Sequence, residues 1–173
     1  MKLFVSVNFD HASKDIIYEH MKLLFDKCES GVFTKKENIH LTLACIGETT
    51  QIGDVVNTLD AIDVPCFDIT LSDGGAFNRS GGDIYWLGID KSAELVKLQK
   101  SIYRNLFRSG VIRDKNDFRP HLTVSRDTVI SKELVPEGKL SYKIPVKRIS
   151  LMKCTADRDG CVFTEIYAKE LKG

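Results

Sequence analysis

One four-residue pattern occurs twice in this chain, and it limits the possible folds more than any other feature of the sequence. His40-Leu41-Thr42-Leu43 returns as His121-Leu122-Thr123-Val124. Each copy starts a predicted strand that follows a predicted helix. Two copies predict a pair of duplicated lobes, because a solenoid needs about three or more repeats. We therefore expect residues 1–173 to form a single domain with two lobes.

Strands and helices alternate along the rest of the chain. Helical spacing predicts three helices: one that Gly31 ends, one between Thr49 and Val64, and one from Ser92 to Gly110. Mixed strand–helix–strand connections favour an α+β fold with antiparallel sheets. A glycine-rich loop is predicted at 74–82. Besides the strand that begins at His121, strands are predicted at 2–9, 32–34, 39–46, 67–71, 84–89, 144–154 and 161–168.

Composition and charge exclude several classes of protein. Twenty-five basic residues against 24 acidic ones leave a net charge of +1, which excludes a polybasic nucleic-acid coat but permits a small basic pocket. The first ten residues turn polar too early for a signal peptide, and no apolar run approaches the ~20 residues of a membrane span. We therefore expect a cytoplasmic protein that does not contact a membrane.

The cysteines also fit a cytoplasmic protein. Their number is five and no CxxC occurs, so neither a disulfide framework nor a zinc knuckle is indicated. Cys154 and Cys161 flank a turn-like stretch and can face each other across a hairpin. Because nothing suggests an oxidising compartment, we expect these two thiols to stay unpaired.

The repeated motif has a clear chemical meaning in a strand, where side chains alternate between the two faces. His40 and Thr42 then share one face, while the aliphatic residues beside them enter an apolar layer. The same holds for His121 and Thr123. If the two lobes pack with pseudo-twofold symmetry, two imidazoles and two hydroxyls meet at one centre.

Two histidines suffice to split a phosphodiester, since one imidazole can take a proton and one imidazolium can return it. The threonine hydroxyls can donate to the phosphate oxygens. Two histidines without a carboxylate cluster are too few for a closed zinc site, so we expect no metal and no cofactor. A lone histidine on a strand is usually structural. His11 and His20 lack the motif and are predicted to be surface or packing residues.

Several blocks of the sequence resemble the 2H phosphoesterase superfamily, and most closely its RNA 2',3'-cyclic phosphodiesterases, which are also called LigT-like or 2'-5' RNA ligase-like proteins. The resemblance covers almost the whole chain. It rests on the opening strand, on the two blocks that contain the motifs, and on a middle block. These are residues 2–7, 38–43 with 46–48, 75–77 with 85–88, and 118–126.

The resemblance implies two pseudo-symmetric lobes of antiparallel sheet, with helices packed outside and a central cleft. It also implies an enzyme that opens a 2',3'-cyclic phosphate at an RNA end and leaves a 2'-phosphate. Carried over to this chain, His40 is the proton donor and His121 the proton acceptor. Thr42 and Thr123 hold the phosphate, and Arg126 contacts the phosphate or ribose of the substrate.

The chain departs from the family pattern just after the first motif. Ala44 and Cys45 stand where the family often has a basic residue and then an aromatic one that could stack a base. Cys45 is predicted to be a small buried hydrophobe and not a nucleophile. Trp86 is predicted to belong to the core.

Three functions are compatible with these features. The first is hydrolysis of RNA 3' ends or nucleoside 2',3'-cyclic phosphates by a monomer. The second is a module that binds RNA ends without turnover. The third is the reverse reaction, which joins RNA through a 2'-5' linkage and is disfavoured by water unless two RNA ends are held together.

Overall fold

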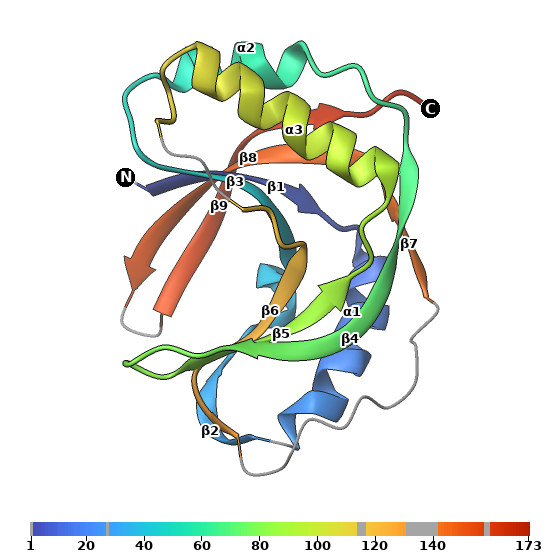
Figure 1. The fold of residues 1–173 in the computed structure, drawn as a ribbon, viewed down its shortest axis with the longest axis vertical. Helices are drawn as coiled ribbons and strands as arrows, with labels where there is room; N and C mark the ends of the chain where they lie inside the picture. Colours follow the sequence, from blue (N-terminus) through green and yellow to red (C-terminus); the bar gives the residue numbers. More distant parts are fainter. Residues whose placement is uncertain (1, 27, 114–116, 131–141, 158–159) are drawn as a thin grey trace.

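The computed structural model describes residues 2–26, 28–113, 117–130, 142–157 and 160–173 (Figure 1). Within these ranges the chain forms two antiparallel sheets, three α-helices and a short 3₁₀ helix, η1. In chain order the elements are β1 Lys2–Asn8, α1 His11–Phe25, β2 Cys28–Phe33, η1 Lys36–Asn38, β3 His40–Glu48, α2 Ile52–Asp60, β4 Phe67–Phe77, β5 Asp83–Ile89, α3 Ala93–Arg108, β6 His121–Ile130, β7 Lys143–Val146, β8 Arg148–Asp157 and β9 Gly160–Glu170.

Each copy of the motif begins a strand, and the two strands belong to different sheets. The four-stranded sheet has the order β3-β1-β8-β9, so the strand of the first motif lies at its edge. The five-stranded sheet has the order β2-β6-β5-β4-β7, with the strand of the second motif inside it. The two motif strands are in contact where the sheets approach each other. The predicted α+β fold with antiparallel sheets is confirmed.

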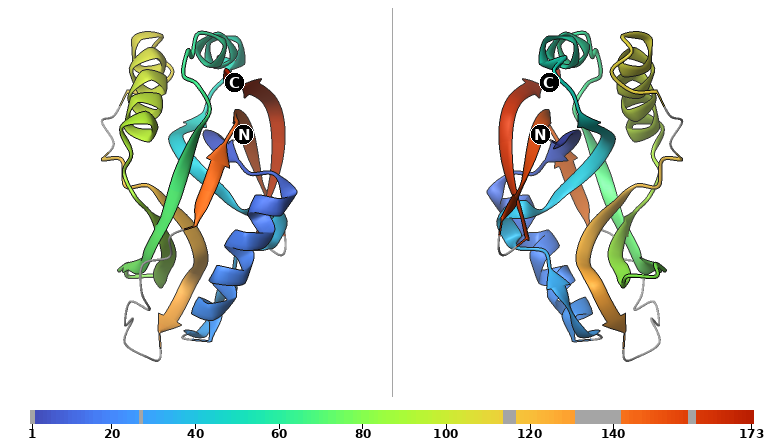
Figure 2. Two further views of the ribbon diagram at one scale, coloured as in Figure 1. Left: turned by 90° about the vertical axis from the view of Figure 1, so that its right-hand side faces the viewer. Right: turned by 90° about the vertical axis from the view of Figure 1, so that its left-hand side faces the viewer.

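The helices cover the outer faces of the sheets. In Figure 2, α2 and α3 lie together at one end of the molecule, and α1 lies at the other. α3 contacts β3 and α2, whereas α1 contacts β2 and β6. The Ser92 hydroxyl accepts a hydrogen bond from the Leu95 amide (3.1 Å) and so caps α3, as the sequence predicts. Among the helices of the described residues, none has the length and hydrophobicity that a membrane span requires.

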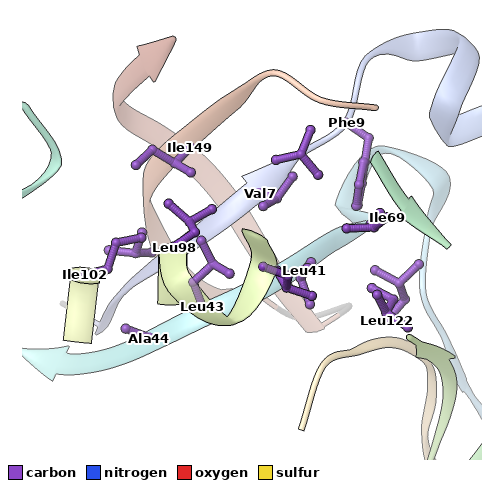
Figure 3. Packing of buried hydrophobic residues seen from close by; sticks show 14 of the residues in the cluster. Val7, Phe9, Leu41, Leu43, Ala44, Ile69, Leu98, Ile102, Leu122 and Ile149 are labelled. Atoms are coloured by element: carbon purple, nitrogen blue, oxygen red, sulfur yellow. The ribbon is translucent and has the colours of Figure 1, made fainter. Parts of the chain in front are cut away.

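A shared hydrophobic core fixes which way the motif strands face. Leu41 and Leu43 of β3 and Leu122 of β6 are buried in the same cluster as Leu98 and Ile102 of α3 (Figure 3). Complete burial of one such side chain contributes about 2 kcal/mol. Because side chains alternate along a strand, burying these leucines turns the neighbouring histidines and threonines to the opposite faces.

Both motif strands carry a β-bulge at the same place in the motif. On β3, Ser6 pairs with Thr42 but Val5 pairs with Ala44, so Leu43 is an extra residue. On β6, Trp86 pairs with Thr123 but Tyr85 pairs with Ser125, so Val124 is the extra residue. A bulge changes the phase of the alternation by one residue.

The consequence is the same in both strands. The fifth residue after each motif histidine returns to the face of that histidine, and these residues are Cys45 and Arg126. The bulge on β3 is supported from α3, where the buried Gln99 amide donates to the Leu43 carbonyl (3.4 Å).

The first helix and the C-terminal strands differ from the sequence prediction. α1 ends at Phe25, and Gly31 lies within β2 and does not cap the helix. Gly31 sits at a bulge with φ +154°, where an added Cβ would come within 3.0 Å of the Thr128 hydroxyl. The predicted strand 144–154 is two strands, because the chain passes from one sheet to the other at Lys147. The Lys147 carbonyl accepts from the Leu171 amide (2.7 Å).

Two further expectations are wrong. β4 continues through Phe77, so the first four residues of the predicted loop 74–82 are strand, paired with β5. Cys154 and Cys161 form a disulfide across the β8–β9 hairpin, with their Cα atoms 6.0 Å apart. The pairing of these two strands places the cysteines diagonally across the hairpin, because Cys154 pairs with Phe163 and Cys161 with Ala156. This proximity depends on the strand register and not on the cellular compartment. Residues 158–159 of the hairpin lie outside the described ranges.

The β3 bulge gives a testable prediction about stability. Replacing Gln99 by Met keeps most of the side-chain volume but removes the donor to the Leu43 carbonyl. We expect Gln99→Met to lower the free energy of unfolding by about 1–3 kcal/mol, measured by urea denaturation. Lys97→Met, at an exposed position on the same helix, should change it by less than about 0.5 kcal/mol. Equal effects of the two substitutions would refute a supporting role for Gln99.

Candidate active site

The two motifs place four polar side chains on the faces opposite the core. His40, Thr42, His121 and Thr123 are each half-buried, while the aliphatic residue that follows each of them is buried. The alternation predicted from the sequence is therefore confirmed in both strands. Each imidazole stands at the first residue of its strand, beside the region where β3 and β6 meet.

Each imidazole is held in the same way by its own backbone. The Nδ1 atom of His40 is 2.7 Å from the carbonyl oxygen of Asn38, and that of His121 is 2.6 Å from the carbonyl oxygen of Arg119. A carbonyl oxygen only accepts, so Nδ1 carries the hydrogen in both rings. The other ring nitrogen, Nε2, is then free of its proton whenever the ring is neutral. Both rings thus present the same atom for proton transfer.

Aromatic side chains surround the two imidazoles. The ring of His40 packs against Phe4 and Phe163, with both centroid distances at 4.9 Å, and these two phenyl rings contact each other at 5.3 Å. The ring of His121 is 5.1 Å from Phe77 and 6.2 Å from Trp86. These contacts limit the rotation of the imidazoles and keep water away from part of each ring. None of these four aromatic residues was predicted from the sequence to belong to the site.

The aromatic surroundings change the acidity of the imidazoles. Burial lowers the pKa of His40 to about 4, against a weaker opposing effect of the Asn38 carbonyl. The positive charges of Arg126 and Lys14 and the His121 ring lower it further. Burial also lowers the pKa of His121, and Arg126 adds to the effect. Both rings are therefore neutral at pH 7 in the free protein.

These electrostatic contacts show which residues lie close together. The charge of Arg126 acts on His40, on His121 and on Cys45, and His121 acts on His40. Arg126 is exposed and reaches this face because of the bulge on β6. The structure thus brings both motifs and Arg126 to one region.

Lys14 is a neighbour of this region that sequence analysis missed. It lies on α1, it donates to the Glu37 carbonyl (2.7 Å), and its charge acts on His40. Nothing in the sequence distinguishes Lys14 from other lysines on the polar side of a helix, so its place near His40 could not be predicted. Asn38 was missed as well. Its carbonyl holds His40, and its side-chain amide donates to the Cys161 carbonyl (3.4 Å) on the β8–β9 hairpin.

Cys45 differs from its prediction. It is exposed on the face of the motif residues and is not a buried hydrophobe, because the bulge at Leu43 shifts the alternation. Desolvation raises the pKa of its thiol, and Arg126 offsets this only in part. The group is therefore a thiol at neutral pH, which makes it a poor nucleophile. The prediction that it does not act as one agrees with this chemistry.

Trp86 is also not a core residue. It is half-buried on the face of His121, and its indole lies over Gly75, where an added Cβ would come within 2.4 Å of a ring carbon. This close approach explains why position 75 carries a glycine, since any side chain there would displace the indole. The indole Nε1 is buried and has no hydrogen-bond partner among the described residues.

The other two histidines stand apart from the site. His11 is exposed and lies 3.6 Å from Asp15. His20 packs against Tyr142 and bonds the Ile16 carbonyl (2.7 Å). Both fit the predicted surface and packing roles. Among the described residues, no group of three or more His, Cys, Asp or Glu side chains is arranged to hold a metal ion.

Comparison with known families and sequences gives a consistent result. Residues 26–156 match the family described as the 2'-5' RNA ligase superfamily. A relative from Archaeoglobus fulgidus, named RNA 2',3'-cyclic phosphodiesterase, is 34% identical over 133 residues, which is 73% of this chain and 72% of the relative. A protein of the same name from Escherichia coli K12 is 29% identical over 140 residues, which is 79% of this chain and 78% of that protein.

Solved structures show the same fold. The apo form of E. coli LigT superimposes with a TM-score of 0.84 and 24% identity, and the match covers 99% of this chain and 98% of that one. The protein TT0787 of Thermus thermophilus gives a TM-score of 0.85 at 18% identity, covering 100% of this chain and 99% of that one. The predicted fold of two antiparallel sheets with helices outside is confirmed by these similarities.

The lowered histidine pKa values predict how stability depends on pH. An unfolded histidine has a pKa of 6.5 and His40 in the fold has one of about 4, so between these values the unfolded chain binds more protons. The free energy of unfolding should therefore fall as the pH is lowered from 7 to 5, by on the order of 1 kcal/mol.

Urea denaturation at several pH values measures this effect. His40→Gln should flatten the dependence, whereas Thr42→Val, in the same strand and without a titrating group, should keep it. If His40→Gln shows the same slope as the wild type, His40 is not a buried neutral ring.

Proposed function

This chain belongs to the 2'-5' RNA ligase superfamily, and from that premise we propose that it is an RNA 2',3'-cyclic phosphodiesterase. The proposed reaction adds water to the cyclic phosphate at an RNA 3' end and leaves a 2'-phosphate and a free 3' hydroxyl. The proposal depends most on one observation. Two imidazoles with the same orienting hydrogen bond lie within electrostatic range of each other and of one guanidinium, Arg126.

In this proposal His121 is the proton acceptor. Its Nδ1 donates to the Arg119 carbonyl, so the neutral ring has a free lone pair on Nε2. That nitrogen takes a proton from water as the water oxygen attacks phosphorus. Its lowered pKa keeps the ring neutral near pH 7, so a base is available without any conformational change.

His40 is the proton donor in the same step. The bond between phosphorus and the 3' oxygen breaks, and Nε2 of the His40 imidazolium gives its proton to that oxygen. The free protein disfavours this proton, since the pKa of His40 is about 4. A phosphate anion beside the ring favours the charged form and raises the pKa. The substrate thus helps to create the acid that its own cleavage requires.

Thr42, Thr123 and Arg126 bind the phosphate in this proposal. The two threonines share the faces of the two histidines, and their hydroxyls can donate to non-bridging oxygens. The guanidinium of Arg126 can donate two parallel hydrogen bonds to the same group. In the free protein, the positive charge of Arg126 lowers the pKa of His40. A phosphate bound between the guanidinium and the imidazole attracts both cations and so raises that pKa again.

Removing either imidazole tests the proposal directly. We expect His40→Ala and His121→Ala each to lower kcat/KM for a 2',3'-cyclic nucleotide by about 10²–10⁴-fold, the usual contribution of a positioned acid or base. His11→Ala, at an exposed histidine outside the site, should keep the wild-type rate. The proposal is wrong if both motif variants hydrolyse the substrate as fast as the wild type.

The pH dependence gives an independent test. The active pair holds one proton, and both histidines have pKa values below the ordinary 6.5, so this form is most abundant below pH 6.5 in the free enzyme. We expect kcat/KM to follow a bell-shaped curve with its maximum below that pH. The curve for kcat should lie at higher pH, because it reports the complex with a bound anion. A kcat/KM maximum above about pH 7 would contradict this account.

A further inference from the structure

A groove along α3 lies outside the residues of the candidate active site. It has a volume of about 1000 Å³ and runs between the end of α2, the exposed side of α3 and the segment before β6. Its lining includes four cationic side chains and two carboxylates. These are Lys91, Lys97, Lys100 and Arg104, with Asp63 and Asp117.

The charge of the groove is positive. All four cationic residues are exposed, and none of them forms an ion pair with a residue in the described part of the chain. Asp63 is already bound by Lys172, which lies 2.7 Å away, and this contact, with Lys97 farther off, lowers the pKa of its carboxyl. The groove therefore offers cations that lack an acidic partner among the residues described.

Three of these cations follow each other along the helix. Lys97, Lys100 and Arg104 are three and four residues apart, so they lie on one side of α3 with about one cation per turn. Exposed Arg108 continues the row. A row of cations at regular intervals matches a ligand with repeated negative charges better than it matches a single anion.

A buried hydroxyl in the groove lacks a partner. Tyr103 lines the groove from α3, and its hydroxyl is buried with no hydrogen bond to any residue that the structure describes. A buried polar group without a partner is unfavourable, and an ordered water or an ion is one of the partners that satisfy such groups in native proteins. Half-buried Phe118 adds an aromatic surface to the same groove.

The groove lies next to the segment that leads into β6, and through Gln99 it touches the core side of β3. Asp117 and Phe118 form one wall, and the next residue, Arg119, gives the carbonyl that orients His121. Gln99 lines the groove and also bonds to the Leu43 carbonyl on β3. Phe118 is three residues before His121, so a strand of nucleic acid with its 3' end at the histidines can reach the groove past the start of β6.

We propose that this groove binds the sugar–phosphate backbone of the RNA that precedes the cyclic phosphate. The inference rests on the proposed function, because it assumes that the RNA end lies at the two motifs. It adds a substrate class: single-stranded RNA is held better than a mononucleotide, since only RNA reaches the groove.

Comparison of two substrates tests the proposal. The variant Lys100→Gln/Arg104→Gln removes two cations from the groove. We expect it to raise KM roughly 10-fold for a short single-stranded RNA that ends in a 2',3'-cyclic phosphate, with a weaker dependence on salt. KM for a 2',3'-cyclic mononucleotide should not change. The control variant Lys22→Gln/Lys143→Gln removes the same charge from exposed positions elsewhere and should leave both KM values unchanged.

A second variant separates binding from folding. Tyr103→Phe removes a hydroxyl without a described partner, so the stability should stay the same or increase. KM for the RNA should nevertheless rise several-fold. The proposal is overturned if Tyr103→Phe and Lys100→Gln/Arg104→Gln act equally on the RNA and the mononucleotide, or on neither.

A binding measurement keeps this proposal distinct from the proposed function. If the wild type hydrolyses neither substrate, the proposed function fails, and fluorescence anisotropy with a labelled RNA that ends in a 3'-phosphate still decides the role of the groove. Binding that weakens roughly 10-fold in Lys100→Gln/Arg104→Gln, but not in the control variant, supports the groove. Equal affinity of all three proteins refutes it.

Discussion

The common core behind the two motif strands is the constraint on which the rest of the structure depends. Leu41 and Leu122 are fully buried in one cluster, although their strands belong to different sheets. Burial of both residues fixes the faces of both strands, and a shift of one residue in either would exchange leucine for histidine. The position of the imidazoles is thus a consequence of hydrophobic packing on the side away from them.

The chemistry of the site follows from the removal of water around the imidazoles. Aromatic contacts desolvate the rings, and a nearby guanidinium opposes their protonation, so the free site carries neutral imidazoles. The carbonyl that bonds each Nδ1 leaves Nε2 available in both rings. Without a bound anion, His40 is neutral near pH 7 and has no proton to donate from Nε2. Proton supply and anion binding are therefore linked events in the proposed reaction.

The periodicity of the sequence correctly predicted which faces the motif side chains occupy, but it did not predict the positions of the residues around them. The His-Leu-Thr pattern has the period of a strand, so the faces of His40 and Thr42 followed from local geometry alone. Cys45 and Trp86 were misplaced because their positions depend on register: one on a bulge supported by Gln99, the other on a glycine in the neighbouring strand. The disulfide was missed for a similar reason, since the pairing of β8 with β9 decides it. Pairing between distant segments is not visible in a local pattern.

The two bulges make the two motif strands chemically different, although the strands are otherwise alike. Each bulge brings one additional side chain to the catalytic face without altering the core, and the two lobes fill this place differently, one with a thiol and the other with a guanidinium. In the proposed reaction, a phosphodiester therefore meets a thiol on one side and a guanidinium on the other, although the two imidazoles are held alike. This inequality adds to the separate roles proposed for His40 and His121 in distinguishing the entering oxygen from the departing one.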